Sequence, residues 1–351
     1  MPEPALYGIS NSNRKKSDFW SKNAFNSSFP VALANYMRDK GIKAKYIKLE
    51  KDLTTTVGEI SIDEVYNAKG KANSQLDFEF ESPYEPYRKY SYDGIDGIDL
   101  VVKGTDGTFL RPLEIKLTVV PDNTTFKKKP AEWGSEIVVR AATTSYCTLG
   151  MMESCKNDFQ KIRSIFEPVC EKIEKWDSSV EISKNIPAFA GLIDRFEETF
   201  IDKQSPLIMQ PIWKTKGQSP FLDDEAFDIF VWSDYAFTRL FLRSSRDSPA
   251  DNKVSRQMRC TARMARCIYE ISKSGKVHLN DIYRRQMAFN YQTDKEFAAS
   301  GMVTNPFMRC DRLTHPIIKK EELFNIVLNG GEEKLQPERR FDQTIFFTMK
   351  K

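Results

Sequence analysis

Residues 92–122 read YDGIDGIDLVVKGTDGTFLRPLEIKLTVVPD, a pattern that predicts a β-hairpin with charged residues inside its strands. Two apolar runs, residues 100–102 and 113–120, flank the turn residues 104–107. An Asp-Gly pair between apolar runs is a strong signal for a tight hairpin. The second run is nearly continuous, which is typical of a central strand covered on both faces.

Three charged side chains are predicted to meet on one face of this hairpin. Residues two apart on a strand share a face, so Glu114 and Lys116 project together. If Asp106-Gly107 is a two-residue loop, Asp99 faces Glu114 across the hairpin. Two carboxylates at this distance repel each other, and a divalent cation with oxygen ligands offsets that repulsion.

Asp96 is the alternative to Asp99 as the first carboxylate. A two-residue loop pairs Val101 with Pro112 and favours Asp99, whereas a bulge would shift the parity and favour Asp96. Pro112 is compatible with a bulge, because proline lacks the N–H that a ladder pair would use. We choose Asp99 because it adjoins the apolar run directly.

A surface ion-pair ladder is the competing interpretation of these charges. It would hold for an arbitrary Glu-x-Lys on a solvated hairpin. Here the surrounding strand is apolar, and charges in a covered strand are costly unless they are paired or bind a metal. The context therefore favours a catalytic or metal-binding site.

Asp99, followed on the next strand by Glu114-Ile115-Lys116, resembles the PD-(D/E)xK nuclease signature. The sequence departs from the pattern at Ile98, which stands where the motif has proline. Residues 25–37 (FNSSFPVALANYM) and 113–125 (LEIKLTVVPDNTT) are similar to HindVP-type type II restriction endonucleases.

The resemblance implies a fold of the α/β class, with a restriction-endonuclease-like mixed sheet flanked by helices and additional DNA-binding elements. It also implies Mg²⁺-dependent double-strand cleavage of DNA at a short palindromic site, GRCGYC, and a partner DNA methyltransferase that protects the host. A palindromic site implies a homodimer. Asp99, Glu114 and the Ile115 carbonyl would bind the Mg²⁺, and Lys116 would orient the attacking water. Similar nucleases use an extra upstream carboxylate, for which Glu79 and Glu81 are candidates beside the alternative of a solvated acidic face.

Basic residues in two places are predicted to contact DNA. Lys127 and Lys128 follow the catalytic strand, where a purely solvated role is equally compatible. A helix beginning at Ser255 carries an arginine stripe at spacings of three and four, formed by Arg256, Arg259, Arg263 and Arg266. Such a stripe repels itself in water and is stabilised by phosphates. The alternative is an ion-paired surface helix, for which few acidic residues stand at matching positions.

The remaining pattern predicts a single endonuclease domain over residues 1–351, with a catalytic core at about 77–215 and a basic DNA-contacting region at about 239–292. Strands are predicted at residues 44–49, 136–140 and 207–213, and a strand-like aromatic run at 228–242. Helices are predicted from Ser27 to Gly41, with Pro30 in the first turn, and over about 147–176.

Composition excludes several other classes of protein. Six cysteines without a C-x-x-C argue against zinc ribbons and redox dithiols. Only two histidines, His278 and His315, argue against histidine–metal nucleases, H-E-x-x-H proteases and most catalytic triads. The net charge of +4 means that affinity for DNA must come from local clusters. No apolar run of membrane-spanning length or secretory signal is present, so we expect the cytoplasm of a prokaryotic cell.

Two rival functions remain at this level. One is a structure-specific or repair nuclease of the same superfamily, which would cleave DNA without sequence preference. The other is a non-catalytic DNA-binding protein whose hairpin is decayed or structural, which would bind DNA without metal-dependent cleavage.

Overall fold

The computed structural model describes residues 22–121, 137–217, 219, 221–246, 254–286, 295–299, 304, 307, 317–328, 345, 348 and 349. Lys127 and Lys128, two of the residues predicted to contact DNA, lie outside these ranges. Among the helices that are described, none has the length and apolar content that a membrane span requires.

Nine strands in the described part of the chain form one mixed sheet, in the order β2-β1-β9-β8-β5-β4-β3, with β6 paired to β8 and β11 to β9. They are β1 (Ala44–Leu49), β2 (Thr55–Ile60), β3 (Leu76–Ser82), β4 (Ile98–Gly104), β5 (Phe109–Ile115), β6 (Thr118–Pro121), β8 (Pro206–Thr215), β9 (Leu222–Ser233) and β11 (Ile318–Lys319). The β1–β9, β5–β8 and β6–β8 pairs are parallel, and the other pairs are antiparallel. The predicted mixed α/β class is confirmed.

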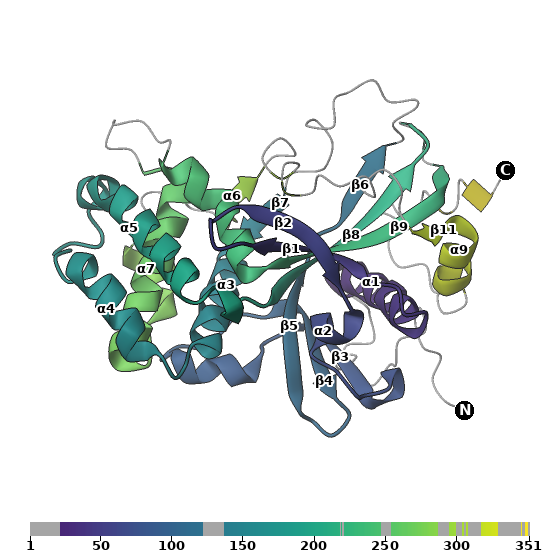
Figure 1. The fold of residues 1–351 in the computed structure, drawn as a ribbon, viewed down its shortest axis with the longest axis horizontal. Coiled ribbons are helices and arrows are strands. Elements are labelled where there is room, and N and C mark those ends of the chain that lie inside the picture. The colour runs from purple at the N-terminus through teal and green to yellow at the C-terminus, as the bar shows by residue number, and fades with distance from the viewer. Residues whose placement is uncertain are drawn as a thin grey trace.

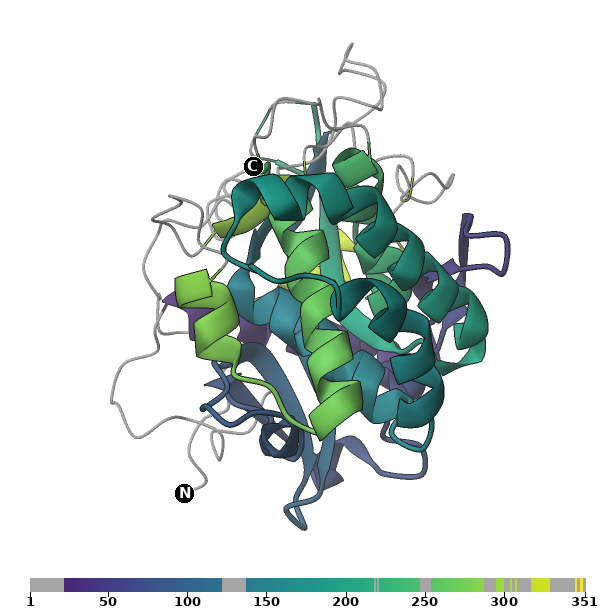
Figure 2. The same cartoon turned by 90° about the vertical axis from the view of Figure 1, so that its left-hand side faces the viewer.

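Helices cover both faces of this sheet, as Figure 1 shows. One face carries α3 (Ala141–Ser154), α4 (Phe159–Cys170), α5 (Ser179–Thr199), α6 (Asp234–Arg246) and α7 (Arg256–Ser274). The other carries α1 (Lys22–Asp39), α2 (Ile62–Tyr66) and α9 (Lys320–Leu328). Figure 2 shows the larger helical layer in front of the sheet. Neighbouring residues of the central strands alternate between the two cores, such as Ile208 and Met209 of β8, because successive side chains point to opposite faces.

The hairpin of β4 and β5 has the predicted register but a different turn. Val101 pairs with Pro112, as predicted. The turn is a three-residue loop in which the Gly104 amide donates to the Thr108 carbonyl at 2.8 Å, and Gly107 has the left-handed φ of 84° that this loop requires. A bulge between Val102 and Lys103 then compensates for the extra loop residue. The predicted two-residue loop is therefore wrong. The pairing of Val101 with Pro112 is nevertheless as predicted, because the longer loop and the bulge compensate for each other.

β6 follows β5 in the chain and continues its parallel pairing with β8. The register Glu114–Ile208 of β5 persists as Thr118–Ile212 of β6. Between them, the Lys116 amide donates to a β8 carbonyl at 3.1 Å. Pro211 has no N–H to return a bond to the Lys116 carbonyl, which explains why regular pairing pauses there.

Several predicted elements need correction. The predicted helix over residues 147–176 is two helices, because α3 ends at Ser154 and α4 begins at Phe159. The first helix begins at Lys22, so Pro30 lies inside it rather than in its first turn. The run 228–242 is half strand and half helix: β9 ends at Ser233, whose hydroxyl accepts from the amide three residues on and so caps α6.

A strand lies within the predicted range 136–140, at residues 137–140, but it is not part of the main sheet. This strand, β7 (Ile137–Arg140), pairs with β10 (Lys295–Ala299) in a separate two-stranded sheet. The predicted strands at 44–49 and 207–213 are confirmed as β1 and β8.

Candidate active site

The hairpin brings Asp99, Glu114 and Lys116 together on the side of the sheet that faces α3. The Ile115 amide donates to Asp99 Oδ2 at 2.8 Å, which fixes the Asp99 carboxylate beside β5. Lys116 Nζ is ion-paired with Glu114 Oε1. Glu114 is buried, and its Oε1 also accepts a hydrogen bond at 2.9 Å from the hydroxyl of Thr143.

Asp96 differs from Asp99 in its surroundings. Its side chain is exposed and precedes β4, and its contribution is a backbone carbonyl that accepts from the Tyr146 hydroxyl at 2.8 Å. The structure thus brings Asp99, not Asp96, into contact with the Glu114-Ile115-Lys116 segment.

The electrostatics of the cluster show a shortage of positive charge. Burial of the carboxyl group and the nearby charge of Glu114 raise the pKa of Asp99 well above its ordinary value. Lys116 and the hydrogen bond from the Ile115 amide oppose this increase without cancelling it. A cation bound beside Asp99 and Glu114 would supply the missing charge.

The donor set fits a hard divalent cation. In an extended strand the N–H and C=O of one residue point to the same side. The Ile115 amide faces Asp99, so its carbonyl points to that side too. Two carboxylates and a carbonyl suit Mg²⁺, which keeps several waters and shares its coordination with substrate phosphate. Over the described ranges no three His, Cys, Asp or Glu side chains are grouped so that they could hold a metal ion by themselves, so the backbone carbonyl, water and substrate phosphate would have to complete the coordination.

The two candidate upstream carboxylates differ in their surroundings. Glu79 is ion-paired with Lys103 at 2.8 Å. Glu81 contributes to the raised pKa of Asp99 and so lies within electrostatic reach of the cluster. Of the two, Glu81 is the better placed to assist a metal ion.

The prediction that all four arginines of the α7 stripe are available to contact DNA is wrong for two of them. Arg259 and Arg263 are 2% and 3% exposed. Arg263 pairs with Glu296 of β10 at 2.5 Å and donates to the Tyr283 carbonyl at 2.7 Å. The physical reason is that α7 packs against α3, α4, α5 and α6, so most of its surface is internal. Arg266 stacks on a tryptophan ring, and Arg256 is partly exposed.

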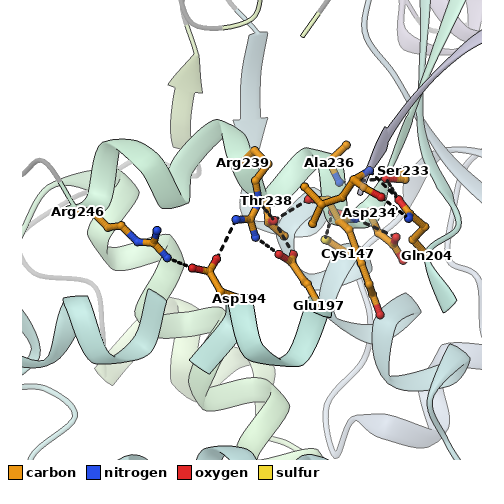
Figure 3. A network of polar contacts seen from close by, with 12 residues as sticks. Cys147, Asp194, Glu197, Gln204, Ser233, Asp234, Ala236, Thr238, Arg239 and Arg246 are labelled. Atoms are coloured by element: carbon orange, nitrogen blue, oxygen red, sulfur yellow. Dashed lines mark hydrogen bonds and ion pairs between the residues drawn. The ribbon is translucent and has the colours of Figure 1, made fainter. Parts of the chain in front are cut away.

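Other basic residues of the predicted DNA-contacting region also serve packing. Figure 3 shows Arg239 and Arg246 of α6 directed at Asp194 and Glu197 of α5. Arg239 pairs with Asp194 at 2.8 Å and with the fully buried Glu197, and Arg246 pairs with Asp194. The charge density of this region therefore does not by itself mark a DNA-binding surface.

Comparison with known protein families identifies the chain: the family model of the HindVP restriction endonuclease matches residues 20–351. The chain belongs to the HindVP restriction endonuclease family. It is 36% identical over 351 residues to the type II restriction enzyme HgiDI of Herpetosiphon aurantiacus, covering 99% of this chain and 97% of that protein. It is 34% identical over 346 residues to the probable type II restriction enzyme HindVP of Haemophilus influenzae, covering 98% and 93%. No solved structure gives a significant match.

Membership of the HindVP family makes the protein a type II site-specific deoxyribonuclease. It confirms the resemblance noted from the hairpin motif. The sequence pattern did not reveal Thr143, because a threonine near the start of a helix has no distinguishing signal.

Proposed function

We propose that this HindVP-family enzyme makes Mg²⁺-dependent double-strand cuts in DNA and that Asp99, Glu114 and Lys116 form its active site. The observation that carries the proposal is the convergence of two carboxylates and a lysine at a buried strand end, where the pKa of Asp99 is raised. Type II restriction endonucleases generally use a divalent metal ion, which agrees with this donor set.

Each residue has a distinct part in the proposed reaction. Asp99, Glu114 and the Ile115 carbonyl would hold the cation, with Glu81 as an assisting carboxylate. A bound divalent cation polarises the scissile phosphate and lowers the pKa of a coordinated water. Lys116, which is ion-paired with Glu114, would orient that water and stabilise the negative charge that develops on the phosphate oxygens.

The finer features of the substrate and assembly rest on the family. We propose a short palindromic site, GRCGYC by family resemblance, a homodimer, one domain per chain, and a cognate methyltransferase in the same cytoplasm. Lys127, Lys128, Arg256 and Arg266 remain candidates for DNA contact. Arg259 and Arg263 are excluded from this set because their burial leaves them little surface for a phosphate.

The first test is cleavage of unmethylated plasmid DNA in the presence of Mg²⁺. Wild type should give discrete fragments, and Glu114→Ala and Lys116→Ala should lose at least roughly 100-fold in rate, the scale of removing one charge-stabilising group, while still binding DNA. The matched control is Glu167→Ala, which removes a carboxylate paired with Arg163 of its own helix, α4.

Each other outcome points to a different function. Smeared products from wild type would favour a nuclease without sequence preference. Binding without cleavage would favour a non-catalytic protein. Full activity of both active-site variants would remove the hairpin from the reaction.

A further inference from the structure

Thr143 uses its hydroxyl differently from its helical neighbours. It lies in the first turn of α3 and is fully buried. The hydroxyls of Thr144, Ser145 and Thr148 donate to carbonyls of their own helix, as Ser and Thr side chains in helices commonly do. The Thr143 hydroxyl instead crosses to the sheet and donates to Glu114 Oε1 at 2.9 Å.

The two oxygens of Glu114 consequently have different surroundings. Oε1 receives both Lys116 Nζ and the Thr143 hydroxyl. Within the described ranges, no hydrogen bond reaches Oε2. An uncharged hydroxyl suits this place, because a second cationic side chain would compete with a metal ion for the carboxylate. Threonine is also stiff at χ1, so little side-chain entropy is lost in holding the contact.

The start of α3 is itself held in place by buried contacts from distant parts of the chain. The Thr144 hydroxyl lies 3.2 Å from the hydroxyl of Tyr283. Arg263 of α7 packs over the Tyr283 ring at 4.8 Å and pairs with Glu296 of β10. Since β10 pairs with β7, which leads directly into α3, these contacts fix the helix turn that presents Thr143.

We propose that Thr143 is a positioning residue for the metal ligand Glu114. Together with Lys116 it holds Oε1, which leaves Oε2 as the oxygen available to the divalent cation. This inference rests on the proposed function, since it requires Glu114 to bind the metal. The role is distinct from catalysis, because Thr143 acts only through the carboxylate that it holds.

The test measures Mn²⁺ binding by titration calorimetry in the absence of DNA, beside the Mg²⁺ concentration that gives half-maximal cleavage. Thr143→Val keeps the shape of the side chain and removes the donor, and Thr143→Ser keeps the donor. Thr148→Val is the matched control, because it removes an equally buried hydroxyl of the same helix that bonds a backbone carbonyl. Thr143→Ala takes the place of the valine variant if that variant does not fold.

We expect Thr143→Val to weaken Mn²⁺ binding by roughly 10-fold, as removal of a group that orients a metal ligand does, and to raise the Mg²⁺ requirement in parallel. Thr143→Ser and Thr148→Val should bind Mn²⁺ like wild type. Wild-type binding by Thr143→Val, equal weakening in Thr143→Ser, or equal weakening in Thr148→Val would each overturn the inference.

Glu114→Ala, measured in the same titration, separates the two proposals. If Glu114→Ala binds Mn²⁺ normally, the proposed metal site itself fails. If Glu114→Ala loses binding while Thr143→Val retains it, only the positioning role of Thr143 fails.

Discussion

At the scale of single residues, the position of Asp99 depends on the absence of a side chain at Gly97. A Cβ there would lie 2.9 Å from the Glu81 carbonyl oxygen and 3.3 Å from the Ser82 nitrogen. Both contacts are backbone atoms of β3, which cannot rotate away as a flexible side chain can. Glycine therefore permits the close approach of β3 to the segment that enters β4.

Gly97→Ala should force these two backbones apart and displace Asp99 from the Ile115 amide. We expect a loss of about 1–3 kcal/mol in the free energy of unfolding, the usual cost of overpacking, measured by urea denaturation. Cleavage should fall with it. Gly94→Ala is the control, because a Cβ at Gly94 meets no atom within 4 Å. Equal effects of the two substitutions would contradict the argument.

Asp234 is a second residue whose environment predicts a measurable effect. Burial raises the pKa of Asp234 to about 7, although the amides of Ser205 and Tyr235 donate to its carboxylate at 2.9 Å. A carboxyl group whose pKa is higher in the folded than in the unfolded state binds its proton more tightly when folded. Its contribution to stability is present at low pH and is lost as the pH rises through about 7.

Asp234→Asn should remove this pH dependence. Relative to wild type, the free energy of unfolding of the variant should increase as the pH rises from about 4 to about 7. Urea denaturation at a series of pH values measures the difference. Parallel curves for the two proteins would show that Asp234 is ionised in the folded state throughout this range.

At the scale of elements, a buried ion pair attaches α7 to the neighbouring strand β10, although the sequence pattern of α7 predicts that its arginines face solvent or DNA. Arg263 and Glu296 are both almost fully buried, and they connect α7 to β10. Loss of one partner leaves the other charge in a low-dielectric environment, which costs much more than the intact pair contributes. The arrangement explains how a helix rich in arginine is tolerated inside the helical layer.

Glu296→Ala should therefore destabilise the protein by about 3–5 kcal/mol, the cost of breaking a buried pair, measured by urea denaturation. The control is Glu171→Ala, which removes an exposed partner of Lys273 on the same helix and should cost less than about 1 kcal/mol. Comparable losses in the two variants would mean that Arg263 finds another partner.

At the scale of the whole molecule, the mixed sheet separates two apolar cores, and the candidate site lies on the side of α3. Each chain carries one such cluster among its described residues. At the proposed palindromic site the two scissile bonds are related by a two-fold axis, and a two-fold dimer would present one such cluster to each strand of the DNA.

The enzyme should therefore act as a homodimer. Analytical ultracentrifugation with uncleaved cognate DNA and without Mg²⁺ should show a protein mass of twice the 40.5 kDa chain. A mass of one chain per DNA site, combined with efficient double-strand cleavage, would rule out the dimer.

The sequence alone predicted the hairpin, the pairing of Val101 with Pro112 and the convergence of Asp99 with Glu114 and Lys116. The hairpin follows from strand periodicity and from partners close together in the chain, whereas the pairing agrees with the prediction only because a three-residue loop and a bulge compensate for each other. It also determined the family. Only the tertiary structure decided that Arg263 is buried and that Thr143 reaches Glu114, because their partners lie 33 and 29 residues away on other elements. Local pattern reports which face of an element is polar, whereas the packing of distant elements decides whether that face meets water or a counter-charge.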